Sequence, residues 1–264
     1  MRVISINAWG GAMFDNLADW LPTCDADVLC VQEVTRTPGL SGWTRFEDQE
    51  RTLPQRANLF ADIAAALPHH QATFVASDAG PVWDSENRRH VQDFGLALLV
   101  HERLPVVGLH ADFVHGQFVE HQTWAIADRP RIAQAVRMVD RDGGRTVTVV
   151  HLHGLRDPAG KADSPQRLAQ AERLGALIEL VRGPDDLVVA CGDFNLLPDS
   201  ETFEILGGHG LVDLVRSTDT RTSRYLKPVR HANYLLVSDP QQVKTFEAPA
   251  QPEVSDHRFL TLEL

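Results

Sequence analysis

The sequence places an acid and an amide, Asp193 and Asn195, directly after a short apolar run. Residues 188–191 are apolar and partly β-branched, as in a strand that is buried on both faces, and Gly192 interrupts the run. Side chains alternate along extended backbone, so Asp193 and Asn195 point the same way at the rim of a sheet. Asp193 can take a proton from water, and Asn195 can donate hydrogen bonds to a charged oxygen. The pair suits chemistry at phosphorus, although such turns are common at strand ends.

Other polar side chains follow apolar runs in the same way. These strand ends carry Asn7, Glu33, His153 with His151 beside it, and Asp256 with His257. Glu33 and Asp256 are hard oxygen ligands of the kind that Mg²⁺ or Mn²⁺ prefers. His257 directly follows Asp256, so one segment can carry both a ligand and a proton-transfer group. Together these residue types predict metal-assisted phosphoryl transfer, because they supply charge stabilisation, an activated water and a proton source.

Four short motifs occur in the order typical of a known superfamily. They are Asn7, Gln32-Glu33, Gly192-Asp193-Phe194-Asn195 and Ser255-Asp256-His257. In this order they resemble the DNase-I-like endonuclease/exonuclease/phosphatase superfamily. The resemblance implies an α/β (α+β) fold, a four-layer sandwich of two packed mixed β-sheets flanked by helices, formed by residues 1–264 as a single domain. It also implies divalent-metal-dependent cleavage of phosphoesters, with Mg²⁺ or Mn²⁺ as the cofactor.

The same resemblance implies roles for the acids and amides. Glu33 would be the principal metal ligand, with Asn7 and Asp256 nearby. Asp193 would orient or deprotonate the attacking water. Asn195 would contact the phosphoryl oxygens in the transition state.

The resemblance also implies two catalytic histidines and an arginine. His257 would be the histidine of the C-terminal motif. The other histidine closes a strand in the family, where His151 and His153 lie on one strand face. We favour His153, because Gly154 follows it where the strand should end, and we expect His151 to contact substrate or support the site. Arg131, which opens the preceding strand, resembles a family position that touches the scissile phosphate.

One position departs from the family pattern. Many members have Asp-Tyr in the strand before the C-terminal motif, and that aspartate supports the catalytic histidine, whereas this chain has Asn233-Tyr234. An amide can hydrogen-bond an imidazole, but it cannot stabilise imidazolium as a carboxylate does. We therefore expect His257 to be less readily protonated and turnover to be reduced, and we expect Asn233→Asp to raise the rate. Natural tuning and an introduced inactivating change both fit the sequence.

Apolar patterns predict the elements that position these residues. Strands are expected at 3–8, 28–31, 74–76, 94–100, 106–109, 131–139, 146–152, 188–191, 234–237 and 259–264, and helices at 14–21, 58–67, 165–182 and 200–206. Polar, Gly and Pro residues predict loops over 35–54 and 78–92. Many strands with a few long helices indicate one α/β sandwich rather than strictly alternating βαβ units.

Composition limits the class of protein. Hydrophobic residues are 43% and charged residues 23% of the 264 residues, as in soluble globular proteins, and the formal net charge is −11. Three cysteines, Cys24, Cys30 and Cys191, sit in apolar contexts without metal-type spacing and read as reduced core residues. We expect a cytoplasmic monomer without stable membrane association. The negative charge argues against a broad grip on polyanions, although metal ions can reverse the local sign.

A basic cluster at 221–227 stands out in this acidic chain. In the superfamily such a loop lies near the site, so we expect Arg224, Tyr225 and Lys227 to bind a substrate phosphate or a base. The leading interpretation of the chain is a nuclease that acts on DNA or RNA. One alternative is a phosphodiesterase for a lipid headgroup or small phosphoester, because residues 7–10 and 151–153 are similar to patches in neutral sphingomyelinases. Another is a phosphate-binding module impaired by Asn233.

Overall fold

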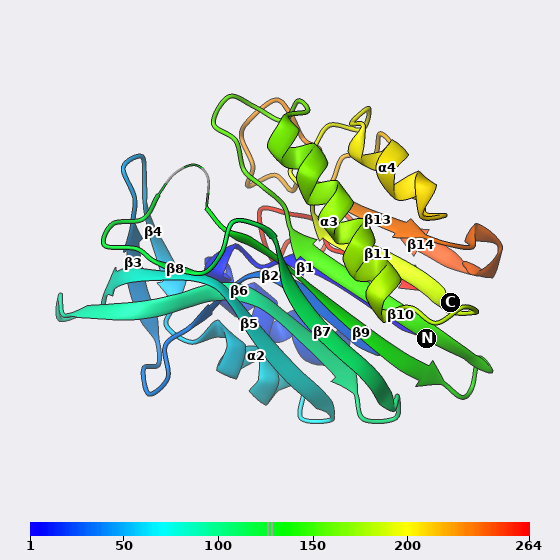
Figure 1. Cartoon of the computed structure of the whole chain (residues 1–264). Helices are drawn as coiled ribbons and strands as arrows, with labels where there is room; N and C mark the ends of the chain where they lie inside the picture. The colour runs from blue at the N-terminus through cyan, green and yellow to red at the C-terminus, as the bar shows by residue number, and fades with distance from the viewer. Residues whose placement is uncertain (126, 128) are drawn as a thin grey trace.

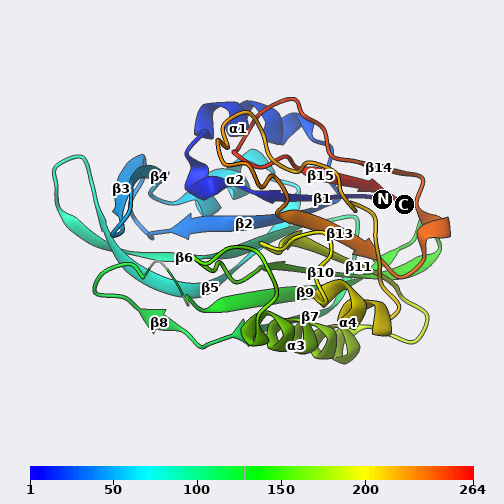
Figure 2. The ribbon, with the colours of Figure 1, turned by 90° about the horizontal axis from the view of Figure 1, so that it is seen from above.

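Two mixed β-sheets pack face to face in this computed structural model, which describes residues 1–125, 127 and 129–264 (Figures 1 and 2). The larger sheet contains β1 (Arg2–Asn7), β2 (Val28–Arg36), β3 (Trp43–Glu47), β4 (Thr52–Arg56), β5 (His70–Trp83), β6 (Arg89–His101), β8 (Val119–Glu120), β14 (Thr245–Glu247) and β15 (Leu260–Glu263). The smaller sheet contains β7 (Val106–His115), β9 (Arg131–Asp140), β10 (Arg145–His153), β11 (Leu187–Asp193), β12 (Val212–Asp213) and β13 (Asn233–Val237).

Helices cover the outer faces of both sheets, which gives four layers in Figure 2. On the larger sheet lie α1 (Phe14–Trp20) and α2 (Leu59–Ala66), with the 3₁₀ turns η1 (Trp9–Gly11) and η2 (Leu21–Thr23) beside them. On the smaller sheet lie α3 (Pro165–Val181) and α4 (Thr202–Gly208), and a third 3₁₀ turn, η3 (Pro240–Gln242), precedes β14. The predicted fold class is confirmed.

The sequence explains why the helices begin where they do. The Ser164 side chain accepts a hydrogen bond from the Arg167 backbone N–H, and Pro165 occupies the first turn of α3. Asn58 caps α2 in the same way, by accepting from Ala61. These caps satisfy backbone donors that a helix end otherwise leaves without partners.

Buried apolar side chains fill the space between the sheets and the space under the helices. Val28 and Cys30 of β2 belong to the inter-sheet core together with Val149 of β10 and Cys191 of β11. A second core lies beneath α1 and α2. All three cysteines are buried and outside disulfides. In the part of the chain that the structure describes, no helix combines the length and apolar character needed to cross a membrane.

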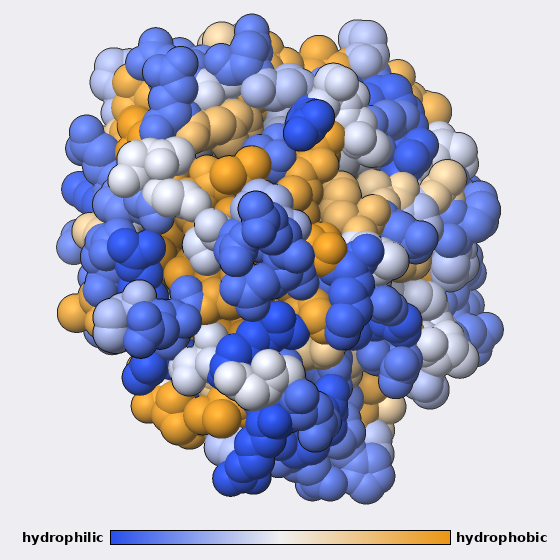
Figure 3. Space-filling view, turned by 90° about the vertical axis from the view of Figure 1, so that its right-hand side faces the viewer, coloured by the Kyte–Doolittle hydropathy of each residue, from blue (hydrophilic) through white to orange (hydrophobic). Residues whose placement is uncertain are grey.

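Strand pairing brings the polar strand ends to one edge of the sandwich. β1 and β2 run parallel, and Asn7 lies opposite Gln32. β10 and β11 also run parallel, and His153 lies opposite Asp193. The carboxyl ends of parallel strands meet at the same edge of a sheet, so chemistry-bearing residues that are distant in sequence become neighbours. The chain termini lie at the other end of the strands, on the face in Figure 3 where hydrophilic residues surround hydrophobic areas.

The two long loops predicted from polar composition are wrong. Residues 35–54 contain the hairpin strand β3 and the start of β4, and residues 78–92 lie mostly in the long hairpin of β5 and β6. Several of their polar side chains are buried and hydrogen-bonded. Gln92, for example, donates to the carbonyls of Arg56 and Ala57 at 3.2 and 3.1 Å. Polarity in these strands reflects internal hydrogen bonding, which composition cannot separate from exposure to solvent.

Gly192 offers a direct test of the strand geometry at the site. Its φ is +136°, and a Cβ there would lie 2.1 Å from the Leu152 carbonyl oxygen of the neighbouring strand. We expect Gly192→Ala to lower the free energy of unfolding by more than about 1 kcal/mol in urea denaturation. The control is Gly207→Ala in α4, where a Cβ meets no atom within 4 Å. An unchanged midpoint for Gly192→Ala would contradict this geometry.

Candidate active site

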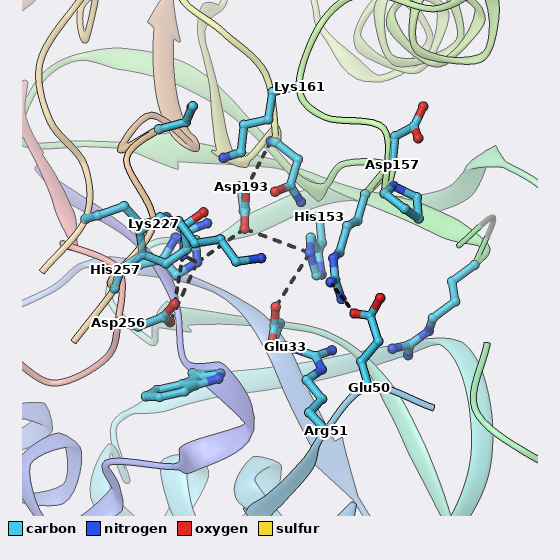
Figure 4. A pocket seen from close by; sticks show the side chains of 18 of the residues that line it. Glu33, Glu50, Arg51, His153, Asp157, Lys161, Asp193, Lys227, Asp256 and His257 are labelled. Carbon is cyan, nitrogen blue, oxygen red and sulfur yellow. Dashed lines mark hydrogen bonds and ion pairs between the residues drawn. The ribbon is translucent and has the colours of Figure 1, made fainter. Parts of the chain in front are cut away.

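Two carboxylates and an imidazole from both sheets converge at the sandwich edge (Figure 4). The ligand atoms of Glu33, His153 and Asp193 all lie within 4.8 Å of one another. His153 Nε2 is 3.7 Å from Glu33 Oε1 and 3.9 Å from Asp193 Oδ2. Paired carboxylate oxygens suit a hard divalent cation such as Mg²⁺ or Mn²⁺. The residues present therefore fit the metal that the sequence predicts.

Asn7 joins the two carboxylates. Its Nδ2 donates to Glu33 Oε1 at 3.0 Å and to Asp193 Oδ2 at 2.9 Å, while its Oδ1 accepts from the Trp9 backbone N–H at 2.9 Å. Because Trp9 N–H can only donate, the amide oxygen must face Trp9, and the nitrogen must face the carboxylates. The sequence predicted Asn7 as a metal ligand. In the structure it is a hydrogen-bond donor to two acids that would otherwise repel each other.

Two of the site residues have unusual backbone conformations. Glu33 has φ +55° and Asn195 has φ +56°, in the left-handed region that residues with a Cβ seldom adopt. The register between β2 and β6 shifts between Val31 and Val34, next to Glu33. Such conformations cost free energy and occur where the surrounding structure enforces them, often at functional sites.

His257 is held in one tautomer. Asn233 Nδ2 donates to the Arg258 carbonyl at 3.0 Å, so its Oδ1 faces His257 Nδ1 at 2.7 Å and accepts a proton from it. Arg221 Nη1 contacts His257 Nε2, which must then carry the lone pair. Burial, followed by the positive charges of Arg221 and Lys161, lowers the pKa of His257 well below its ordinary value. The direction agrees with the sequence prediction, but its cause is burial and positive charge, and the effect of Asn233 stays a prediction.

Arg221 opens the basic cluster that the sequence predicts to lie near the site, although substrate contacts were expected from Arg224, Tyr225 and Lys227. It donates to Asp256 Oδ2 at 2.9 Å, and its guanidinium carbon lies 4.0 Å from the Tyr225 ring centre. Asp256, predicted as a metal ligand, thus pairs with Arg221 and lies outside the group of Glu33, His153 and Asp193. Burial raises the pKa of Asp256 to about 7. The positive charge of Arg221 opposes this rise, whereas the negative charges of Glu33 and Asp193 add to it.

Arg131 fixes the orientation of His153. Arg131 Nη1 lies 3.4 Å from His153 Nδ1 and can only donate, so Nε2 carries the imidazole proton toward Glu33 and Asp193. Burial, followed by nearby arginines headed by Arg131, lowers the pKa of His153 well below its ordinary value. His153 is therefore a neutral donor, suited to a phosphoryl oxygen.

His151 does not reach the cleft. It is fully buried, and its ring nitrogens lie 3.4 Å from Gln32 Nε2 and 3.2 Å from Gln134 Oε1. The prediction that it contacts substrate is wrong, because it points between the sheets where no solute can reach it. Burial lowers its pKa to about 3, which keeps it neutral.

The remaining predicted residues line one cavity of about 680 Å³. The same cavity is lined by Glu33, His153, Asp193, Asp256 and His257. Asn195 donates from its side chain to the Gly154 carbonyl at 3.4 Å and from its backbone to Asp193 Oδ1 at 3.0 Å. The cavity walls also include Arg224, Tyr225 and Lys227.

The sequence did not predict Lys161 as a site residue, because its context indicated only a helix start. Lys161 contacts the His231 carbonyl, and burial lowers its pKa to about 8.

The cavity is basic although the chain is acidic. Of the described lining residues, nine are arginine or lysine and five are acidic. The acidic ones are Glu33, Glu50, Asp157, Asp193 and Asp256. The net charge of −11 is therefore distributed so that the cleft favours an anion.

A family model described as "Endonuclease/Exonuclease/phosphatase family" matches residues 4–257. A mannosyl-6-phosphatase from Bacteroides thetaiotaomicron has a similar structure, with a TM-score of 0.67 and 17% identity, over 100% of this chain and 98% of that one. The catalytic domain of human nocturnin gives 0.62 and 18%, over 99% of this chain and 92% of that one. At these identities the likeness concerns the fold.

One curated relative matches in sequence. The inositol phosphosphingolipids phospholipase C of Schizosaccharomyces pombe is 25% identical over 260 residues, which cover 92% of this chain and 51% of that protein. The chain thus spans about half the length of that relative.

Replacing Asn7 tests its place between the carboxylates. Asn7→Asp brings a third acid to Glu33 and Asp193, so we expect the thermal midpoint in EDTA to fall by about 5 °C. Added MgCl₂ should restore more of the midpoint in the variant than in the wild type, because a cation replaces the lost donor. Asn58→Asp is the control, since aspartate also caps a helix. An equal midpoint for Asn7→Asp and wild type in EDTA would refute the bridging role.

The contacts of Asn233 reverse the prediction made from the sequence. An aspartate there would bring a carboxylate oxygen against the Arg258 carbonyl, which accepts the amide N–H at 3.0 Å. We expect Asn233→Asp to lower kcat at least about tenfold, rather than raise it, because the His257 orientation is lost. Steady-state kinetics with a thermal unfolding check measures this, and a faster variant would support the prediction made from the sequence.

Proposed function

The chain belongs to the endonuclease/exonuclease/phosphatase family, and on that premise we propose that it is a divalent-metal-dependent phosphodiesterase for substrates of headgroup size. Membership of the family supports hydrolysis of a phosphoester. The observation that carries the proposal is the meeting of Glu33, His153, Asp193 and His257 in one basic cavity.

Glu33 and Asp193 would hold the divalent cation. When bound, the ion supplies positive charge opposite the phosphoryl oxygens. His153 Nε2–H and the Asn195 amide are the donors available to those oxygens, since both residues line the cavity. In this arrangement the neutral donors His153 and Asn195, together with arginines of the cavity, would bind the phosphoryl group. Glu33 and Asp193 would stay directed at the cation.

Proton transfer would involve Asp193 and His257. Asp193 would orient the attacking water by accepting a hydrogen bond from it, and its Oδ2 lies 3.5 Å from His257 Nε2. The lone pair on Nε2 would receive the water proton once Arg221 turns from the imidazole to a phosphoryl oxygen, and His257 would then give that proton to the leaving oxygen as its bond to phosphorus breaks. Asn233 holds the opposite nitrogen throughout, so the ring keeps its direction.

The shape of the cavity favours a small substrate. Its volume of about 680 Å³ is in the range of small-molecule sites. Arg156 Nη2 lies 3.4 Å from Glu50 Oε2, which links the loop after β10 to the β3–β4 turn (Figure 4). A rim joined in this way suits a headgroup or a terminal phosphoester better than a duplex. The similarity to the inositol phosphosphingolipids phospholipase C of Schizosaccharomyces pombe supports the same choice.

A nuclease acting on single strands is the second candidate. Tyr225 lines the cavity beside basic Arg221, Arg224 and Lys227, and an aromatic ring among cations can stack with a base. The sequence alone favoured this interpretation, but the linked rim favours the smaller substrate. The third hypothesis, a binding module without turnover, becomes an outcome of the assay.

Hydrolysis of bis-p-nitrophenyl phosphate, with MgCl₂, MnCl₂ or EDTA, tests the reaction class. We expect turnover to need the metal, and we expect Asp193→Asn and His257→Gln each to lower kcat by about 10²-fold or more. Asp62→Asn is the control, because Asp62 lies on α2, outside the cavity, where it pairs with Arg56. Retained turnover in EDTA would contradict the proposal.

Parallel assays then decide the substrate class. Sphingomyelin and phosphatidylinositol represent headgroup phosphodiesters, and single-stranded DNA and RNA represent the second candidate. We expect the highest kcat/KM on a lipid headgroup. A higher kcat/KM on single strands would favour the nuclease, and phosphate binding without any turnover would favour the binding module.

A further inference from the structure

We propose that Arg129 and Arg131 form a second anion-binding subsite beside His153, for a phosphate or carboxylate group that the substrate carries in addition to the scissile phosphodiester. The proposal rests on the proposed function. It specifies a substrate headgroup that is itself anionic, rather than a neutral or cationic one such as choline.

Arg131 is a buried cation without an acidic partner. It is 4% exposed and begins β9, and its Nε is buried with no hydrogen-bond partner. Within the described residues, its side chain makes one hydrogen bond, to His153 Nδ1 at 3.4 Å, and no ion pair. Burial, followed by repulsion from Arg129, lowers the pKa of Arg131 to about 10. An uncompensated buried guanidinium is costly, and an anion would relieve that cost.

Arg129 is fixed in place before any ligand arrives. Its Nε and Nη2 donate to Asp78 at 2.6 and 2.9 Å, and its guanidinium carbon lies 4.5 Å from the Phe94 ring centre and 4.7 Å from that of Trp124. Asp78 is fully buried and also contacts His121 Nε2 at 3.0 Å. In the described part of the chain, Arg129 Nη1 makes no hydrogen bond. Such a preorganised donor loses little entropy when it binds an oxyanion.

Neighbouring cations of the cavity already have acidic partners. Arg156 pairs with Glu50 at 3.4 Å, and Arg51 pairs with Asp48 at 2.9 Å. Of the two arginines, Arg129 pairs with Asp78, whereas Arg131 makes no ion pair with any described residue. The uncompensated positive charge on this side of His153 therefore belongs to the arginine pair.

The imidazole of His153 separates this subsite from the proposed metal site. Its Nδ1 faces Arg131. Its Nε2 faces Glu33 and Asp193, as Figure 4 shows. An anion on the arginine pair thus lies across the imidazole from the scissile group. Since all these residues line one cavity, one substrate can place a charge in each position.

Binding of inorganic phosphate in EDTA tests the subsite without turnover. Without a cation, Glu33 and Asp193 repel phosphate from the scissile position, so calorimetry reports the arginine pair. We expect Arg131→Gln to weaken phosphate binding at least tenfold, while its amide can still donate to His153. Arg137→Gln is the matched control, because Arg137 lies on the same strand but pairs with Asp186 at 2.8 Å. Equal affinity for wild type and Arg131→Gln would overturn the proposal.

A pair of chromogenic substrates separates the subsite from the scissile position. One is the p-nitrophenyl phosphodiester of ethylene glycol, and the other carries a phosphate on the second hydroxyl. We expect wild type to prefer the phosphorylated substrate in kcat/KM, and we expect Arg131→Gln to reduce that preference at least tenfold, unlike Arg137→Gln. Equal losses on both substrates would assign Arg131 to the scissile group and overturn the proposal.

The two experiments also distinguish this proposal from the proposed function. If neither substrate is hydrolysed and phosphate binding still depends on Arg131, the reaction class fails and the anion subsite stands. If both are hydrolysed without preference and phosphate binding is independent of Arg131, the subsite fails and the reaction class stands.

Discussion

The site depends on holding two carboxylates, Glu33 and Asp193, against each other across the junction of two sheets. Like charges at this distance repel, and burial strengthens the repulsion because water no longer screens it. Asn7 offsets it with two hydrogen bonds from one amide nitrogen. The sandwich thus brings the acids together, and the amide keeps them there.

Burial determines the charge state of the rest of the site. Both cleft histidines lie deep enough that desolvation keeps them neutral, and each has its tautomer fixed by one donor or acceptor. Arg131 directs His153 as a donor, whereas Asn233 and Arg221 direct His257 as an acceptor. Two residues of one type therefore serve opposite roles, because their hydrogen-bond partners differ.

The acidic composition and the basic cleft are compatible because charge is segregated. Acids outside the cleft keep the net charge negative, while arginines gather where the strands end. Positive charge confined to one cavity selects a ligand that fits inside it, whereas a positive face would grip a polymer.

The four short motifs implied the sandwich fold by resemblance, and apolar runs predicted the ends of β1, β10 and β11 to within two residues, because such runs report where a strand is buried. The same pattern ended β2 too early, since that strand continues past Glu33 to Arg36. The sequence could not reveal the hairpin of β5 and β6, whose polar residues are buried by pairing with distant segments. Only the tertiary structure decided that Asn7 turns its nitrogen to the acids, that His151 faces Gln134, and that Arg129 pairs with Asp78 whereas Arg131 makes no ion pair with any described residue. The physical reason is that the role of a polar group depends on the partner that compensates it, and that partner is set by contacts between residues far apart in the chain.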